Sequence, residues 1–330
     1  MTMNTKALTG WLTLIAVLAA TMPYAARAAA PNTKPVPNRA SANPATPAKA
    51  RNSIARDPYV GAIVIDAASG RVLFEDQADA KGYPASMLKL MDLLIVLEMV
   101  QYGRLSLQDP VTVSARASKI GGSQVWLAEK EVFTVDELLY ALMVQSANDA
   151  ALALAEKVAG TPEVFMELMN QRARALGMTN TVFHTVHGLP PSAGQEHDVT
   201  TARDFARLCR EVLRHPDALR YTSTRERPFR PNAGKKTVVM RTHNHLLGAV
   251  EGCDGLKTGY FLEAGYSLAA TAARQGQRVV AMVLGSTEWK VRDAKATELI
   301  ARGFLALPPA PSPAARPAAG TNKPPVSPKR

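Results

Sequence analysis

Three short groups of polar residues could share one chemical task in this chain of 330 residues. The first is Ser86 with Lys89, the second is Ser146 with Asn148, 60 residues further on, and the third is Lys257–Gly259, another 111 residues along. Each group alone is common in proteins. In this order they supply hydroxyls, amines and an amide, which are groups that an acyl-transfer reaction through a covalent intermediate can use.

Ser86 and Lys89 stand at the head of an unusually apolar segment. Over residues 87–100 only Lys89, Asp92 and Glu98 carry charge, so the pattern predicts a helix that is buried on all sides. Residues three apart share a helix face, and burial lowers the pKa of a lysine because desolvation disfavours its ammonium form. A neutral amine beside a hydroxyl can activate Ser86 as a nucleophile. The alternative is a lysine that reaches the surface or pairs with Asp92.

The second group would serve the same reaction. Ser146 would transfer protons between Lys89 and a leaving group, and Asn148 would hold both a substrate carbonyl and the lysine. Serine and asparagine are also favoured at helix caps, which is the purely structural explanation of this pair.

The third group stands at the predicted beginning of a strand. Lys257 and Thr258 would hold a substrate carboxylate, whereas Gly259 would leave the strand edge bare so that a peptide can lie against it. The backbone N–H groups of Ser86 and Tyr260 would form an oxyanion hole. Ser86 at a helix N-terminus would also present backbone donors to an incoming carbonyl.

Hydrophobic patterning predicts the elements that position these groups. Apolar strands are expected over residues 59–66 and 71–76, joined by a turn, and again over 267–271 and 277–284, joined through Gly276. Helices are expected over 87–100, after the capping box at 134–137, and over 147–159, 162–177, 200–215 and 291–305. Strands at both ends that enclose a block of helices predict one sheet assembled from distant segments, with a helical lobe beside it.

The charge distribution argues against a nucleic-acid-binding protein. Residues 1–56 hold seven Lys and Arg and no acid, and residues 308–330 hold four and no acid, which together equal the formal net charge of +11. Residues 57–307 therefore carry 28 basic and 28 acidic residues. Because nucleic-acid-binding domains usually concentrate Lys and Arg on a folded face, no nucleic-acid partner is expected.

The two ends predict export and flexible linkers. Lys6, an apolar stretch and a small-residue site indicate a signal peptide over 1–30, cleaved near Ala28 to Ala30, which would leave no stable membrane anchor. A Pro/Ala-rich basic linker is expected over 31–56, a single catalytic domain over 57–307 and a disordered Pro-rich tail over 308–330.

Cysteines and histidines give weaker signals. Cys209 and Cys253 could pair in an oxidising compartment or remain separate thiols. His243 and His245 would lie on one face of an extended segment and could begin a zinc site, but no third ligand stands nearby. No metal or cofactor is therefore expected.

The three groups in their contexts resemble a known family. Residues 84–91, 146–150 and 254–260, within about 59–307, are similar to those of low-molecular-mass penicillin-binding proteins, the serine D-alanyl-D-alanine carboxypeptidase family (peptidase family S11). The resemblance implies an α+β, β-lactamase/transpeptidase-like fold with a five-stranded antiparallel sheet and a flanking helical lobe.

It also implies an activity and a location. Ser86 would be acylated by the penultimate D-alanine of a peptidoglycan stem peptide, the terminal D-alanine would leave, and water would hydrolyse the acyl-enzyme. Peptidoglycan stem peptides would be the substrates and β-lactam antibiotics covalent inhibitors, in the periplasm.

Two departures and three alternatives accompany the resemblance. Leu88 replaces a small hydroxyl residue of the first motif, and Asp92 stands where threonine is usual. The tail begins at 308, where many relatives continue into a β-rich domain and an anchoring helix. Family members without such an anchor include endopeptidases, so a D,D-endopeptidase acting on cross-bridges is the alternative. A β-lactamase is less favoured because no acid occurs between Glu167 and Glu196. A protein that only binds peptidoglycan would not need all three groups.

Overall fold

The computed structural model describes residues 53–230 and 237–309. These residues belong to one compact unit, Lys49–Arg330. The expected signal peptide with its cleavage site, nearly all of the linker over 31–56 and nearly all of the tail over 308–330 lie outside the described residues. Among the described residues, none of the helices combines the length and the apolarity that crossing a bilayer requires.

A five-stranded antiparallel sheet is assembled from both ends of the described chain, as expected. Its order is β2-β1-β9-β8-β7, so the segment that carries Lys257 forms an edge strand. The first two strands form the predicted hairpin. The strand bounds are Gly61–Asp66 for β1, Val72–Asp76 for β2, Cys253–Phe261 for β7, Gly265–Arg274 for β8 and Gln277–Ser286 for β9.

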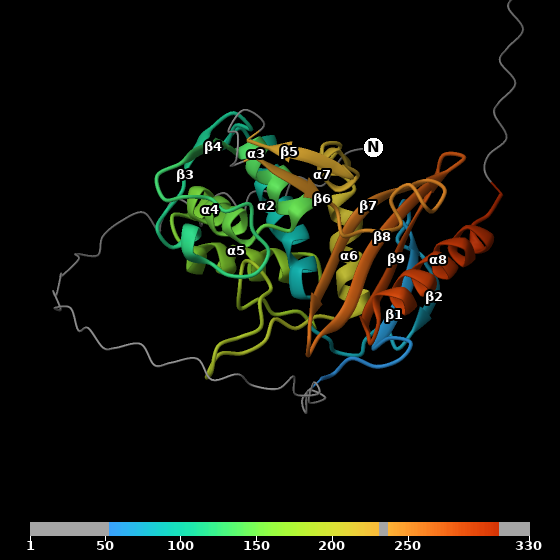
Figure 1. Ribbon diagram of the computed structural model, residues 1–330. Helices are drawn as coiled ribbons and strands as arrows, with labels where there is room; N and C mark the ends of the chain where they lie inside the picture. The colour runs from blue at the N-terminus through green and yellow to red at the C-terminus, as the bar shows by residue number, and fades with distance from the viewer. Residues whose placement is uncertain (1–52, 231–236, 310–330) are drawn as a thin grey trace, which may run out of the picture. The chain divides into compact units, whose positions relative to one another are not determined.

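Successive side chains along these strands point to opposite faces of the sheet, and each face belongs to a separate apolar core. One face of the sheet, with Val279, Ala281 and Val283 of β9, packs against α8 (Trp289–Ala306). The other face, with Val280 and Met282, belongs to the main core and packs against α6 (Ala202–Val212). Figure 1 shows the sheet between α8 on one side and the helical lobe on the other. The central strands β1, β9 and β8 are consequently apolar on both faces.

The helical lobe surrounds one central helix, α2 (Lys89–Gln101), in which every residue from Lys89 to Met99 is buried, as predicted. It contacts helices on several sides. The other elements of the lobe and its edges are η1 (Ala85–Leu88), η2 (Ala117–Lys119), α3 (Val135–Tyr140), η3 (Ala141–Gln145), α4 (Asn148–Ala159), α5 (Pro162–Ala175), α7 (Ala218–Thr222) and the strands β3 (Pro110–Thr112), β4 (Val132–Thr134), β5 (Glu226–Phe229) and β6 (Val238–Arg241).

Local signals marked most helix ends correctly. Thr134 and Glu137 form the predicted capping box of α3, and Thr161 caps α5 with a proline in its first turn. The helix expected to continue to residue 143 instead widens into a π-helix over Ala141–Gln145. Helix α6 is shorter than predicted, because Thr201 accepts a hydrogen bond from the backbone N–H of Asp204 and so begins it at 202. Both cysteines are free thiols in the structure.

Candidate active site

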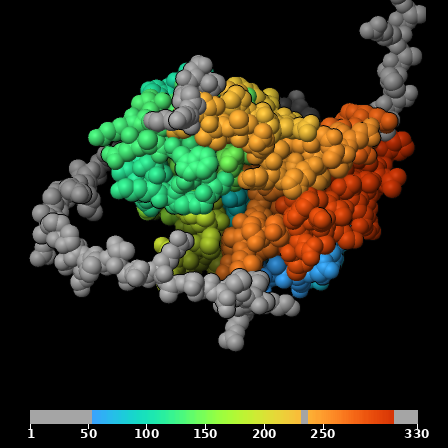
Figure 2. Space-filling view, in the orientation of Figure 1, coloured from blue at the N-terminus to red at the C-terminus, as the bar shows by residue number. Residues whose placement is uncertain are grey.

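A cavity of about 620 Å³ lies where the helical lobe meets the edge strand β7. Figure 2 shows the molecule hollowed between the green lobe and the orange strands. The cavity is lined by Ser86, Gly122, Ser123, Ser146, Asn148, Gly188, Leu189, Pro190, His243, His245, Thr258, Gly259, Tyr260, Phe261, Tyr266, Trp289 and Arg292. Six of the eight residues predicted for the site are in this lining. The other two, Lys89 and Lys257, are buried behind it.

Ser86 lies in the tight turn η1 immediately before α2. The turn is held between two glycines from distant parts of the chain: a Cβ at Gly188 would overlap the carbonyl of Ala85, and one at Gly259 would overlap the carbonyl oxygen of Pro84. Glycine at 259 therefore has a reason other than the expected bare strand edge, because the nucleophile's own turn occupies the space. The backbone of Ala85 itself adopts a positive φ of 48°, a conformation that is uncommon for non-glycine residues and that often occurs at functional sites.

Lys89 is fully buried, and its amine is surrounded by hydrogen-bonding atoms. Its Nζ lies 3.0 Å from Ser86 Oγ and donates to Asn148 Oδ1 at 2.8 Å and to the backbone oxygen of His187 at 2.6 Å. These bonds exclude the alternative of a lysine that reaches the surface, and none of them involves Asp92. The amine, the serine hydroxyl and the asparagine amide predicted from separate motifs thus lie within hydrogen-bonding distance.

Burial controls the charge of this amine. Desolvation lowers the pKa of Lys89 from 10.5 to about 7, opposed by the negative charges of Asp92, Asp198 and Asp149. The nearby His187 imidazole stays neutral near pH 7, since burial lowers its pKa to about 4. A substantial fraction of Lys89 is consequently the free base at neutral pH.

This shift predicts the pH dependence of acylation. Because the neutral amine is the base, and the pKa of Lys89 is lowered to about 7, the acylation rate should rise with pH and reach half its maximum near pH 7. Stopped-flow measurement of penicillin acylation between pH 5 and 10 checks this. A rise centred near pH 10 would instead indicate an amine that keeps its ordinary basicity.

Asp92, one of the two departures from the family motif, lies one turn beyond Lys89 and is almost completely buried. Neither carboxyl oxygen has a hydrogen-bond partner within the described ranges. Burial raises the pKa of Asp92 well above its ordinary value, whereas the charge of Lys89 lowers it. Leu88, the other departure, is fully buried in the main core and does not line the cavity.

Ser146 and Asn148 approach the nucleophile from the opposite wall. Ser146 ends the π-helix with a positive φ of 61°, and its Oγ has no hydrogen-bond partner in the part of the chain that the structure describes. Asn148 Nδ2 donates to the oxygen of Gly121 at 2.8 Å, which leaves its second hydrogen for a substrate. The N-cap of α4 is Ala147, without a side-chain cap, so neither Ser146 nor Asn148 is the N-cap of this helix.

The third group lies within β7 rather than at its beginning, because the strand already begins at Cys253. Thr258, Gly259 and Tyr260 line the cavity. Lys257 is only 3% exposed, and its Nζ donates to the backbone oxygen of Thr258 at 3.1 Å. Burial and the charge of Lys89 lower the pKa of Lys257. Lys257 thus lies on the face of β7 that is turned toward the main core, as its register partner Ala269 does. Another cation lines the cavity.

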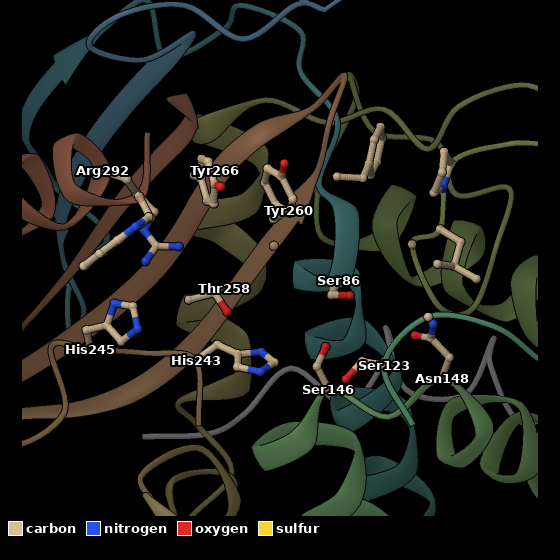
Figure 3. Close-up of a pocket in the computed structure, with 17 residues that line it drawn as sticks. Ser86, Ser123, Ser146, Asn148, His243, His245, Thr258, Tyr260, Tyr266 and Arg292 are labelled. Carbon is tan, nitrogen blue, oxygen red and sulfur yellow. The ribbon is translucent and has the colours of Figure 1, made fainter. Parts of the chain in front are cut away.

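That cation is Arg292, which no sequence motif indicated. It lies in the first turns of α8, is 3% exposed and donates from Nε to Asp293 Oδ1 at 2.8 Å. Figure 3 shows Arg292 beyond Thr258 as seen from Ser86. Ser123, also missed, donates from Oγ to the oxygen of Gln145 at 2.6 Å. No motif in the sequence indicates the role of either residue.

His243 and His245 both line the cavity, but they follow β6 in a turn-rich loop instead of an extended segment. Burial, and secondarily the charge of Lys257, lowers the pKa of His243 to about 4. His245 Nδ1 is hydrogen-bonded to Asp293 Oδ2 at 2.8 Å. Within residues 53–230 and 237–309, no three His, Cys, Asp or Glu side chains are grouped as a metal site.

Comparison with known proteins agrees with this geometry. Residues 50–288 match the model of the D-alanyl-D-alanine carboxypeptidase family. The chain belongs to this family. It is 35% identical to D-alanyl-D-alanine carboxypeptidase DacF of Bacillus subtilis, over 74% of this chain and 61% of the relative, and 36% identical to DacC of Escherichia coli, over 73% and 60%. The chain thus spans about three fifths of the length of these relatives.

A solved structure extends the agreement to the fold. Penicillin-binding protein D2 from Listeria monocytogenes in its ampicillin-bound form superimposes with a TM-score of 0.67 at 31% identity, covering 75% of this chain and 97% of that one. The resemblance to low-molecular-mass penicillin-binding proteins and the expected α+β fold, a five-stranded antiparallel sheet with a helical lobe, are both confirmed.

Proposed function

We propose that this protein is a serine-type D-Ala-D-Ala carboxypeptidase that acts on peptidoglycan stem peptides through an acyl-enzyme on Ser86. The observation that carries the proposal is the buried Lys89 amine, which lies 3.0 Å from the Oγ of Ser86, a residue that lines a cavity beside an edge strand. A peptide can add to such an edge through backbone hydrogen bonds, and its penultimate D-alanine carbonyl then lies above the nucleophile.

Acylation uses groups that surround the hydroxyl. Neutral Lys89 accepts the proton of Ser86 as Oγ attacks the carbonyl, and Ser146, whose Oγ faces the cavity, transfers a proton to the leaving amine. The free N–H of Asn148 binds the carbonyl of the acyl part. Backbone N–H groups of Ser86 and Tyr260 stabilise the oxyanion. Water, activated by the regenerated Lys89 amine, then hydrolyses the ester.

The terminal carboxylate is held on the other side of the nucleophile. Thr258 and Arg292 provide a hydroxyl and a guanidinium in the cavity wall, and Lys257, buried on the core-facing side of β7, adds positive charge. A carboxylate that binds here favours the charged form of Lys257 by Coulombic attraction. The cavity lining, taken from the described residues, contains no Asp or Glu, which disfavours the β-lactamase alternative because class A enzymes deacylate with a glutamate.

The sequence and the relatives support the setting of this reaction. The N-terminal pattern of a cleaved signal peptide indicates a periplasmic protein, and the ampicillin-bound relative supports β-lactams as covalent inhibitors. The direct test is the release of D-alanine from a synthetic stem peptide that ends in D-Ala-D-Ala, followed by mass spectrometry. If the purified protein neither releases D-alanine nor becomes acylated by penicillin, the proposed function is wrong.

The role of Arg292 gives a sharper prediction. Arg292→Met should lower kcat/KM for a peptide with a free terminal carboxylate by roughly 10 to 100-fold, since a hydrogen bond to a charged group is lost. The same peptide with an amide cap provides the internal reference, and Arg292→Lys should restore part of the loss. Equal losses on both peptides would remove the carboxylate role and leave only a structural one.

A further inference from the structure

Another cavity, of about 360 Å³, lies where α6 and the end of α5 meet the β1–β2 hairpin. Strands β2 and β7 form the two outer edges of the sheet (Figure 1), so this α6 cavity lies near the edge opposite the candidate active site. The two cavities have no lining residue in common, so a ligand here would leave Ser86 uncovered. The α6 cavity is lined by Ile63, Ile65, Ser69, Gly70, Val72, Leu176, Arg203, Ala206, Arg207, Arg210, Glu211 and Arg214.

Four arginines dominate the polar part of this lining. Arg203, Arg207, Arg210 and Arg214 follow one another at spacings of four, three and four residues, so they lie along one face of α6 and just beyond its C-terminal end. Against these four guanidinium groups the lining contains a single carboxylate, that of Glu211. The cavity is therefore suited to an anion.

Two of the arginines are partly committed to the fold. Arg203 donates from Nε and Nη2 to Asp79 at 2.8 and 3.0 Å, and Nη2 also pairs with Glu75 at 2.7 Å, so two carboxylates neutralise it. Arg207 contacts Asp204 at 2.6 Å through Nη1. Among the described residues, the hydrogen bonds of Arg207 all come from Nη1, so its Nε and Nη2 can donate to a ligand.

Arg210 is the least compensated cation of the four. Its Nε and Nη2 donate to the backbone oxygens of Ala67 and Ala68 at 3.0 and 2.7 Å, in the turn between β1 and β2. In the ranges that the structure describes, no carboxylate pairs with this guanidinium, and Nη1 has no acceptor. Gly70 provides the necessary space, because a Cβ there would overlap Nη1. The turn thus fixes a cation in the lining and leaves donors unused.

Arg214 adds a cation from the solvent side. Its side chain is 69% exposed and donates from Nη1 to Glu211 Oε2 at 3.1 Å. The same carboxylate accepts a hydrogen bond from Arg172 at 2.7 Å. Since Glu211 shares its negative charge between two guanidiniums, it neutralises Arg214 only in part.

The number of available donors favours a phosphate group over a carboxylate. A carboxylate pairs in one plane with a single guanidinium, whereas the three or more oxygens of a phosphate can accept hydrogen bonds from several directions. The volume is close to the lower limit of ligand cavities, about 300 Å³, so the ligand must be small. Ile63, Ile65 and Leu176 provide an apolar surface beside the arginines.

We propose that the α6 cavity binds a phosphate ester with a short aliphatic part. The phosphate lies between Arg207, Arg210 and Arg214, and the aliphatic part packs on the apolar lining. This site does not depend on the proposed function, because it shares no residue with the catalytic cavity. Its ligand is either a soluble ester or the headgroup of an anionic phospholipid, since both carry the same chemical group.

The experiment is a calorimetric titration of the purified protein with butyl phosphate. Arg214→Gln and Arg210→Lys should each raise Kd by roughly tenfold, since a charge-assisted hydrogen bond is lost and lysine lacks the planar donor set of arginine. Arg241→Gln is the matched control, because Arg241 is also 69% exposed and ion-paired, with Glu226, but lies outside the lining. Its Kd should stay within about twofold of the wild type. Arg214→Gln should leave penicillin acylation unchanged.

Comparison ligands establish the chemistry and its source. Pentanoate, which replaces the phosphate with a carboxylate, should bind at least roughly tenfold more weakly than butyl phosphate, and equal affinity would overturn the proposal. Saturable binding of butyl phosphate supports a soluble ester. Binding only to phosphatidylglycerol vesicles, absent with phosphatidylcholine and lost in Arg214→Gln, supports a lipid headgroup.

Three results would reject the site. One is that neither butyl phosphate nor phosphatidylglycerol vesicles bind. Another is that Arg214→Gln and Arg210→Lys bind as tightly as the wild type. The third is binding that disappears in Arg292→Met and persists in Arg214→Gln, because it would locate the anion in the catalytic cavity. Melting temperatures of the unliganded variants identify any loss that comes from unfolding.

Discussion

Ser86→Ala should abolish covalent labelling by penicillin and lower D-alanine release by a factor on the order of 10⁴ to 10⁶, as losses of nucleophiles in other serine hydrolases do. The hydroxyl lies 3.0 Å from the Lys89 amine, and no other hydroxyl is in hydrogen-bonding contact with that base in the described part of the chain. Gel fluorescence with a labelled penicillin and mass spectrometry of the intact protein measure the effect.

Ser123→Ala is the matched control for this variant. Ser123 also lines the cavity, but its hydroxyl donates to the backbone oxygen of Gln145, so its loss should leave labelling in place. If Ser86→Ala retained stoichiometric labelling, the nucleophile would have to be another residue and the acyl-enzyme mechanism proposed for Ser86 would be wrong.

Lys89→Met should reduce the acylation rate by roughly 10² to 10⁴-fold, the usual contribution of a positioned general base. Methionine has a similar length and fills the same buried space, so the core should remain intact. Folding forces the lysine amine to lose solvation, which opposes folding wherever the unfolded chain would be protonated, that is, below about pH 10. The variant should therefore melt at the same temperature as the wild type or higher.

The control for that loss is Lys295→Met, which removes an amine from the surface of α8, where it bonds Glu298. Its acylation rate should equal that of the wild type. The residual rate of Lys89→Met should also lose the rise near pH 7 expected for the intact protein. A rate within about threefold of the wild type would show that Lys89 only packs the core and that another group takes the proton.

Much of the fold could be predicted because its signals are local. The capping box at Thr134 and Glu137, the proline after Thr161 and the unbroken apolar segment of α2 each specify one helix through neighbouring residues alone. Short continuous apolar segments similarly indicate strands that are buried on both faces. The π-helix before Ser146 could not be predicted in this way, since it depends on how the segment packs and not on its propensities.

The candidate site was predictable where side chains form motifs and unpredictable where backbone atoms or distant helices contribute. Nothing in the sequence indicates that the carbonyl of His187 accepts a hydrogen bond from Lys89, because every residue has a carbonyl. Arg292 resembles an ordinary charge on an amphipathic helix until the sheet places it beside Thr258. Lys257 was identified, but its burial outside the cavity lining emerged only from the packing.

The two glycines that enclose the Ser86 turn also limit how this protein can evolve. Even one methyl group at Gly188 or Gly259 would displace the backbone that carries the reacting oxygen, so selection for new substrates has almost no freedom there. Substitutions are tolerated better at the end of the cavity lined by Trp289 and His245, because both side chains are exposed and can change without moving the nucleophile. Substitutions that reduce acylation by a bulky antibiotic should accordingly accumulate at this end of the cavity and leave the Ser86 turn unaltered.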